Sequence, residues 1–267
     1  MAIKRTASHY GLIALFVVLI IVGIVTGSGS CSENQQAADS SGSASEQTST
    51  ASSDSAANVS YTWDENAAPD YYLVTGTAQV KDAPAKGTIT YSKLDRLGRT
   101  RTAVGTITYQ RVEESAGWRE EIKPEANPSG WGHNGRARIA LSTGGYYTGY
   151  FWNRSHLIAD SLGGHAVRRN LVTGTRMQNV GANETDGGMA YCETKVRNWL
   201  YKHHKGSVYY RAEPIYRKKE LVCRVVVVDM KSSDASIDEH VIVYNAAKGY
   251  EIDYKTGTFR ESIAASQ

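Results

Sequence analysis

Residues 32–58 contain only small or polar side chains, with no aromatic or large aliphatic residue between Cys31 and Val59. A segment of this kind cannot bury enough apolar surface to offset the conformational entropy lost on folding. We therefore expect a flexible tether over residues 32–58. The tether separates an N-terminal segment from one folded domain at residues 59–267. A domain of that length can bury a sizeable core.

The N-terminal segment, residues 1–31, has the features of an export signal. Lys4 and Arg5 precede an uncharged, mainly apolar run at residues 12–25, which is the order found in a signal peptide. With its neighbours, the run nearly reaches the length of about 18 residues expected of a membrane-spanning helix. Small residues precede Cys31, as at a bacterial lipoprotein cleavage site, although Ser28 stands where that site usually has Leu. A lipoprotein, a cleaved secreted protein and an uncleaved signal anchor therefore stay open, and all three place the remaining chain outside the cytoplasm.

The charge of the predicted domain is mildly positive. Residues 59–267 hold 28 basic and 23 acidic side chains, which gives a net charge of +5. An excess of this size is compatible with a polyanionic substrate but does not require one. The sequence indicates no obligate protein partner, and contact with a membrane is expected only through the N-terminal anchor or a lipid.

Three cysteines occur in the chain. If Cys31 carries a lipid, Cys192 and Cys223 remain as an even pair, which could form a disulfide in an exported domain. Two unpaired, buried cysteines are the alternative. No Cys/His cluster has the spacing of a zinc site, because the adjacent His203 and His204 cannot chelate one ion from a single helix face.

Local patterns predict an α+β fold with a mainly antiparallel sheet and one functional helix packed on it. Apolar residues repeat at threes and fours over residues 189–202, which predicts that helix. The four valines at 225–228 predict a central strand buried on both faces. The many glycines and prolines of residues 115–135 predict a long loop. Alternating and β-branched residues predict strands at 88–91, 103–109, 146–152, 208–212, 221–230 and 240–244, and a hairpin at 250–259.

The motifs that indicate a chemistry lie between Trp152 and Glu193. Residues 152–164 read WNRSHLIADSLGG, residues 169–181 read RNLVTGTRMQNVG, and residues 187–189 read GGM. This stretch resembles the DNA/RNA non-specific endonuclease family, and it is most similar to the branch of streptococcal DNases and competence-type DNA-entry nucleases. Weaker similarity at LDRLGR (94–99) and NPSGWG (127–132) extends the match over most of the domain. The resemblance implies a ββα-metal core.

Two positions of the central motif depart from the family pattern Asp-Arg-Gly-His. Asn153 replaces the Asp, and asparagine can make the same Asx-type hydrogen bond that organises a turn. Ser155 replaces the Gly, which predicts that this backbone position does not need a positive φ. Neither change removes the general base or the metal ligand that the family uses, so we expect an active enzyme.

The resemblance assigns a role to each residue of the predicted site. His156 matches the general base that takes a proton from water, a task suited to a neutral imidazole near pH 7. Asn179 matches the one side-chain ligand of a hydrated Mg²⁺, with Mn²⁺ as an alternative ion. Asn170 matches an asparagine that supports the metal site, and Glu193 matches the helix carboxylate that orients water around the ion. Hydrolysis of DNA, with RNA as a further candidate, would then leave 5′-phosphates.

Other polar residues have weaker claims to a role. Arg154 is a catalytic candidate that could contact phosphate or could instead pair with a carboxylate inside the fold. Arg99 and Arg176 are candidate substrate-binding arginines. His165 is the reserve general base. A further two residues compete with Glu193 for the water-orienting role, Asn183 and Glu184.

Two other classes of protein compete with an active nuclease. A catalytically silent relative could capture DNA at the cell surface, although His156 and Asn179 are both present. A different exported hydrolase is disfavoured, because the sequence has neither a Gly-x-Ser-x-Gly elbow nor a His-Glu-x-x-His motif.

Overall fold

The computed structural model describes residues 60–182 and 186–262. These residues belong to the compact unit from Ser55 to Gln267. The predicted tether, the export segment and the domain boundary at residue 59 lie outside or at the edge of the described residues, so they stay predictions. Within the described part, no helix is long and apolar enough to span a bilayer.

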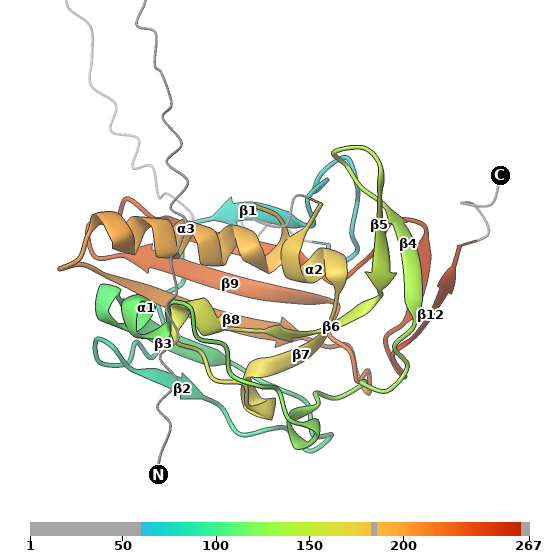
Figure 1. Ribbon diagram of the computed structural model, residues 1–267, viewed down its shortest axis with the longest axis horizontal. Helices are drawn as coiled ribbons and strands as arrows, with labels where there is room; N and C mark the ends of the chain where they lie inside the picture. Colours follow the sequence, from blue (N-terminus) through green and yellow to red (C-terminus); the bar gives the residue numbers. More distant parts are fainter. Residues whose placement is uncertain (1–59, 183–185, 263–267) are drawn as a thin grey trace, which may run out of the picture. The chain divides into compact units, whose positions relative to one another are not determined.

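A twisted sheet forms the centre of the domain (Figure 1). Within the described residues it has six strands, and every pair of neighbours is antiparallel. In spatial order the strands are β1 (Tyr72–Gly76), β10 (Asp238–Tyr244), β9 (Val225–Ser232), β8 (Ser207–Ile215), β3 (Ala103–Thr108) and β2 (Ile89–Tyr91). The predicted α+β class with a mainly antiparallel sheet is confirmed.

Strand β9 is buried on both faces, as its four valines predict. Val226 and Val228 pack into the large core on one side of the sheet, whereas Val225 and Val227 belong to a second cluster on the other side. Because successive side chains of a strand point to opposite faces, a run of apolar residues requires cover on both. The cover on the first face is a helix.

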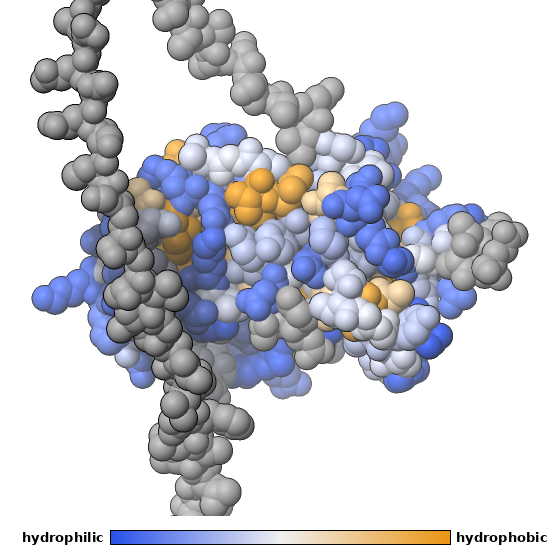
Figure 2. Space-filling model, turned by 90° about the horizontal axis from the view of Figure 1, so that it is seen from above, coloured by the Kyte–Doolittle hydropathy of each residue, from blue (hydrophilic) through white to orange (hydrophobic). Residues whose placement is uncertain are grey.

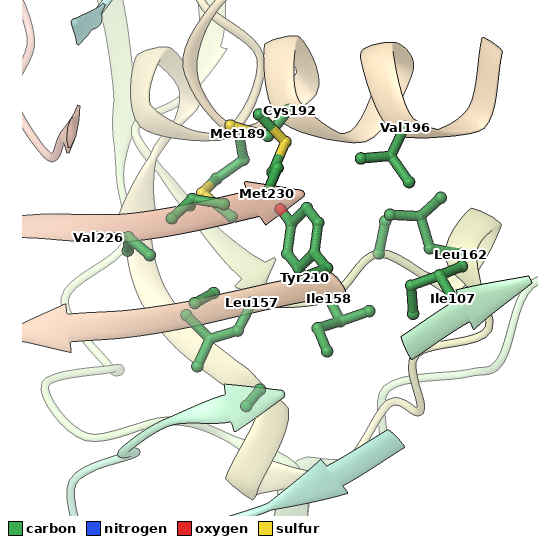
Figure 3. Packing of buried hydrophobic residues seen from close by; sticks show 14 of the residues in the cluster. Ile107, Leu157, Ile158, Leu162, Met189, Cys192, Val196, Tyr210, Val226 and Met230 are labelled. Atoms are coloured by element: carbon green, nitrogen blue, oxygen red, sulfur yellow. The ribbon is translucent and has the colours of Figure 1, made fainter. Parts of the chain in front are cut away.

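Helix α3 (Gly188–Lys202) provides this cover, and it confirms the helix predicted at 189–202. Its inward side chains Met189, Cys192, Val196 and Leu200 are fully buried. Figure 3 shows Met189, Cys192 and Val196 directed at the sheet. The same core contains Tyr210 and Met230 of β8 and β9 together with Leu157 and Ile158. The segment that follows His156 is therefore part of the main core, which limits how far it can move.

A smaller ββα unit lies beside the main sheet. Strand β6 (Trp152–His156) pairs with β7 (Leu171–Thr175), and the chain continues directly into α2 (Arg176–Val180) and then α3. The Thr175 hydroxyl caps α2 by accepting a hydrogen bond from the Gln178 amide. Gly181 and Gly187 approach so closely that a Cβ on Gly181 would lie 2.4 Å from the Gly187 Cα. Glycine at both positions brings the end of α2 against the start of α3.

The remaining elements surround these two parts. Strand β4 (Arg136–Ala140) pairs with β5 (Tyr146–Tyr150), and β11 (Tyr250–Asp253) pairs with β12 (Thr258–Glu261), which confirms the predicted hairpin at 250–259. Helix α1 (Tyr109–Ser115) follows β3. Three short 3₁₀ helices complete the fold, η1 (Pro124–Ala126), η2 (Asp160–Leu162) and η3 (Arg168–Asn170).

Several predicted boundaries differ from the structure. The strand predicted at 146–152 is two elements, because β5 ends at Tyr150 and β6 begins at Trp152 in a different sheet. The strand predicted from residue 221 begins only at Val225, since the amides of Leu221 and Val222 both donate to the Tyr254 carbonyl instead of to a neighbouring strand. Helix α1 was not predicted. It begins where the Thr108 side chain accepts a hydrogen bond from the Arg111 amide.

Cys192 and Cys223 are both free and buried, and they belong to the same core cluster. Burial raises the pKa of the Cys223 thiol to about 12. Both cysteines therefore act as small apolar core residues, which is the second of the two alternatives considered for them.

Candidate active site

The ββα unit brings together the four residues that the motif assigns to the site. His156 is the last residue of β6 and pairs with Leu171, the first residue of β7. Asn170 immediately precedes β7, Asn179 lies on α2, and Glu193 lies on α3. The strand pair and the two helices that carry these residues follow one another in the chain (Figure 1).

Asn170 fixes the position of the loop that follows His156. Its side chain is fully buried, and its amide nitrogen donates to the carbonyls of Ile158 (2.9 Å) and His165 (3.0 Å). Its amide oxygen accepts a hydrogen bond from the Ile158 backbone nitrogen at 3.0 Å. These three bonds all go to backbone atoms. Asn170 can therefore support a metal site only indirectly, by fixing the position of this loop.

His156 has an unpaired ring nitrogen inside the protein. Its Nε2 atom is buried and has no hydrogen-bond partner among the described residues. Burial lowers the pKa of His156 below its ordinary value of 6.5, and nearby Arg119 lowers it further, whereas the carboxylates of Asp160 and Glu120 act in the opposite direction. The imidazole is therefore neutral at pH 7 and can accept a proton. Leaving such a nitrogen unpaired costs stability, about 1–3 kcal/mol, and a catalytic role is one of the physical reasons for which proteins retain such a group.

Glu193 is held in an environment that disfavours its charge. Burial raises the pKa of its carboxyl from 4.5 to about 8; Arg197 opposes this effect and Asp160 adds to it. Arg197 lies one helical turn after Glu193 and donates hydrogen bonds to the hydroxyls of Ser161 and Thr194, both at 3.1 Å. A positive charge beside Glu193 would favour its ionisation, as a bound cation also would.

A stability prediction follows from the pKa of Glu193. The carboxyl ionises near 4.5 in the unfolded chain and near 8 in the folded protein, so the fold loses stability as pH rises through this window. Glu193→Gln removes the buried charge, and we expect it to raise the free energy of unfolding at pH 9 by about 2 kcal/mol, or the Tm by roughly 5 °C. This value is below the full shift because the side chain is only partly buried.

The measurement is thermal unfolding between pH 4 and pH 9 in the presence of a chelator. At pH 4 the variant and the wild type should unfold alike, since both carry a neutral side chain at position 193. Glu121→Gln is the matched control, because Glu121 is exposed. A Glu193→Gln variant whose Tm follows that of the wild type at every pH would show that Glu193 is not charged in a buried environment.

Ser155 contacts the predicted metal ligand directly. Its hydroxyl donates to Oδ1 of Asn179 at 2.9 Å, and the serine side chain is buried. Gly174 on the paired strand makes room for this contact, since a Cβ there would lie 2.9 Å from the Ser155 Cβ. Ser155 also lies in regular β6 and is absent from the positive-φ residues, as the sequence predicts. The motif residue that differs from the family's glycine thus orients the Asn179 amide.

Arg154 links β6 to the long loop that precedes it. Its guanidinium donates to the Ile122 carbonyl (3.0 Å) and to Oδ1 of Asn127 (3.2 Å), and it lies 5.4 Å from the centre of the Trp131 ring. None of these partners is the carboxylate considered in the sequence analysis. These contacts give Arg154 a structural role, which is to hold the long loop against β6. Its predicted catalytic role finds no support in its geometry.

The two predicted substrate arginines differ in their surroundings. Arg99 pairs with Asp95 at 2.6 Å, donates to the carbonyls of Lys218 and Glu220, and lies over the Tyr216 ring. Its guanidinium makes all of these contacts within the domain, so we no longer assign Arg99 to the substrate. Arg176 begins α2, three residues before Asn179, and lies 5.3 Å from the centre of the Tyr147 ring. Its assignment stays a prediction.

The remaining candidates are less well placed or lie outside the described residues. His165 is an exposed loop residue whose Nδ1 atom lies 3.6 Å from Glu120, and this setting gives the reserve base no advantage over His156. Asn183 and Glu184 fall outside the described residues. Sequence reasoning missed Arg197 and Arg119. The spacing of four residues from Glu193 could have indicated Arg197, but nothing in the long loop marked Arg119.

The donor set suits a hydrated divalent cation. Within the described residues, no group of three or more His, Cys, Asp or Glu side chains could hold a metal ion. Ser155 uses only one of the two lone pairs of the Asn179 amide oxygen, so the other can bind a cation. Mg²⁺ commonly keeps several waters and can be held by a single side-chain oxygen. Glu193 and the neutral His156 are then available to water around the ion.

Known proteins are similar to this chain in sequence. A family model described as DNA/RNA non-specific endonuclease matches residues 70–264. A deoxyribonuclease of Streptococcus dysgalactiae subsp. equisimilis is 33% identical over 226 residues, which are 73% of this chain and 68% of the relative. These likenesses confirm the resemblance drawn from the motif.

Solved structures show the same fold. The structure of Sda1 nuclease with a bound zinc ion has 38% identity and a TM-score of 0.73, and it covers 75% of this chain and 100% of that chain. NucA from Streptococcus agalactiae with a magnesium ion bound has 21% identity and a TM-score of 0.56, and it covers 74% of this chain and 93% of that chain. At this identity, the second likeness concerns the fold alone.

Proposed function

The chain belongs to the DNA/RNA non-specific endonuclease family and is a nuclease, and on this premise we propose that it is an endonuclease that uses a divalent cation and His156 as the general base. We propose DNA as the substrate, with RNA as a further candidate. The observation that carries this proposal is the buried, unpaired Nε2 atom of His156. It belongs to the residue next to Ser155, whose hydroxyl holds the Asn179 amide oxygen.

The residues of the chain support in-line hydrolysis. Nε2 of His156 accepts a proton from a water molecule, and the oxygen of that water attacks phosphorus while the bond to the 3′ oxygen breaks. The product carries a 5′-phosphate, and the 3′ oxygen leaves as a hydroxyl after taking a proton from solvent water, while His156 returns its proton to solvent. Asn170 keeps the imidazole in place by holding the loop that follows it. Contacts to phosphates rather than to base edges would make cleavage independent of sequence.

Asn179 would hold the cation, with Glu193 orienting water around it. Mg²⁺ is our first choice and Mn²⁺ the second. When bound, the ion supplies positive charge that stabilises the phosphoryl oxygens and the leaving oxygen in the transition state. The presence of zinc in Sda1 nuclease and of magnesium in NucA supports a divalent ion here and leaves its identity to experiment.

The contact between Ser155 and Asn179 leads to a prediction for metal binding. Ser155→Ala removes the hydrogen bond that orients the amide, and we expect it to weaken Mg²⁺ binding about tenfold, as other outer-shell substitutions do. Titration calorimetry on the protein without nucleic acid measures this directly. Ser207→Ala is a matched control, because Ser207 is also a buried strand serine but belongs to β8. Equal Mg²⁺ affinity in Ser155→Ala and wild type would contradict the proposed orientation of Asn179.

We place the nuclease outside the cytoplasm, anchored or secreted. The support comes from the sequence of residues 1–31, which lie outside the described residues.

The surface in Figure 2 is hydrophilic over most of its area, with hydrophobic residues in a few limited regions. Such a surface suits a hydrated polyanion better than an apolar partner.

A digest of DNA and RNA side by side tests the proposed function. We expect plasmid DNA to be cut only when a divalent cation is present, with 5′-phosphates on the products, and the RNA digest decides whether RNA is also a substrate. A catalytically silent DNA-binding module, the alternative function, would bind the plasmid without cutting it. Products with 3′-phosphates, or full activity in a chelator, would contradict the proposed chemistry.

A further inference from the structure

A surface cavity of about 430 Å³ lies between the end of α1, the turn that follows it, η2 and α3. The side chains around it are both aromatic and basic. Its walls include Ser115, Trp118, Arg119, Ser161, Arg197 and Tyr201. The function proposed above assigns no task to this cavity, to Trp118 or to Tyr201.

Charged residues that line the cavity also act on His156 and Glu193. Arg119 forms an ion pair with Asp160, with the two atoms 3.4 Å apart, and both residues line the cavity. The same two charges act on the pKa of His156. Arg197 also lines the cavity; it lies one helical turn from Glu193 and donates a hydrogen bond to Ser161. A strand whose phosphate lies at His156 would therefore reach this cavity with a neighbouring nucleotide.

Trp118 is placed to meet a ligand and not to fill the core. It is 59% exposed, and within the described residues its indole makes no ring contact. The preceding Gly117 has a φ of +73°, and the Trp118 amide donates to the Ser115 carbonyl. Trp118 therefore follows a tight turn, and its exposed side chain lines the cavity. Tyr201, 43% exposed, adds a second aromatic side chain.

The charge of the rim favours a phosphate chain as the occupant. The Arg119 side chain, next to Trp118 in sequence, is 86% exposed, so its guanidinium can contact a phosphate as well as Asp160. An exposed aromatic ring beside a basic side chain is the combination with which proteins bind single-stranded nucleic acid, because every base can stack on a ring. A base within a duplex is already stacked and cannot do so.

We propose that this cavity is a nucleotide subsite, in which one unpaired base of the substrate strand stacks on Trp118 while Arg119 contacts an adjacent phosphate. The proposal rests on the proposed function, since it places the scissile phosphate at His156. It gives the enzyme a preference for single-stranded or locally melted substrate over intact duplex.

The test is strand binding in the His156→Ala background with a chelator present, so that nothing is cut. Fluorescence anisotropy compares a 12-residue thymidine strand with an abasic strand of equal length. With Trp118 present, the thymidine strand should bind about tenfold more tightly, the effect expected of one stacked base. With Trp118→Ala, the two strands should bind within about twofold of each other. Trp118→Phe should retain most of the difference, because it keeps a ring.

Tyr150→Ala is the control, since Tyr150 is equally exposed but lies on β5, away from the cavity. It should leave the difference between the two strands unchanged. A Trp118→Ala variant that weakens both strands equally would overturn the proposal, and so would one that weakens neither. In enzymes with His156 intact, Trp118→Ala should lower kcat/KM more on single strands than on duplex. Failure of the proposed general base would appear separately, as metal-dependent cutting by His156→Ala.

Discussion

Replacing His156 with alanine is expected to lower the rate of metal-dependent DNA cleavage by about 10²- to 10⁴-fold, the contribution of a positioned general base. The physical reason lies in the state of the imidazole. Its Nε2 atom is buried and unpaired, and burial keeps the ring neutral at pH 7. Alanine leaves the water without an acceptor for its proton. The measurement is the initial rate of plasmid degradation at saturating Mg²⁺.

The pH dependence of the wild type checks the same assignment. The pKa of His156 lies below 6.5, because burial and Arg119 together outweigh Asp160 and Glu120. A general base works in its neutral form, so the rate should stay high as pH falls to 6.5 and should drop only below that value. A rate that already declines between pH 8 and pH 7 on the acid side would indicate a different base.

His165→Ala is the matched control for this substitution. It removes the same side chain nine residues later, from an exposed loop position beside Glu120. We expect its activity to stay within about threefold of the wild type, since an exposed ring that pairs with a carboxylate has no unpaired buried nitrogen. If His165→Ala lost activity while His156→Ala kept it, the reserve base would be the true one.

Replacing Asn179 with alanine is expected to lower activity by at least about 100-fold, and Mg²⁺ binding should become undetectable by calorimetry. Outer-shell residues alone change metal affinity by 10- to 100-fold, and Asn179 supplies the one side-chain oxygen that we assign to the ion. No cluster of acidic side chains among the described residues could replace it. Without the ion, the developing charge on the phosphoryl and leaving oxygens is not neutralised.

The control for Asn179→Ala is Asn198→Ala, an exposed asparagine on α3. It should bind Mg²⁺ and cut DNA as the wild type does. Thermal unfolding separates a lost ligand from a damaged fold, because the stability gained on adding Mg²⁺ should disappear only in Asn179→Ala. Unchanged Mg²⁺-dependent cleavage by Asn179→Ala would contradict the assignment.

Elements with strong local signals were predictable from the sequence. The repeat of Met189, Cys192, Val196 and Leu200 predicted α3 because each turn of a helix buries the same face. The valines of β9 predicted a strand covered on both sides. In contrast, β6 and β7 form a separate two-stranded sheet, and their polar residues have no alternation that would indicate a strand. Their pairing depends on contacts between distant residues, which local patterns do not contain.

The sequence identified the residues of the candidate site, but it did not predict all the contacts between them. The motif identified His156, Asn170, Asn179 and Glu193, and the fold gathers them in one unit. The motif could not reveal that the Ser155 hydroxyl donates a hydrogen bond to Asn179. This contact depends on the space left by Gly174. Arg99 is a second case. It pairs with Asp95 within a turn, where the helical i, i+4 rule does not apply.

Chemical rescue tests most directly whether a neutral imidazole at position 156 and a divalent cation on Asn179 act in the same reaction. The measurement is the rate of plasmid cleavage by His156→Gly as imidazole is added, with Asn179→Ala treated identically. We predict that imidazole restores part of the activity of His156→Gly in proportion to its neutral form, only when Mg²⁺ is present, and that it restores none in Asn179→Ala. Full activity of His156→Gly without imidazole, or equal rescue of both variants, would contradict this account.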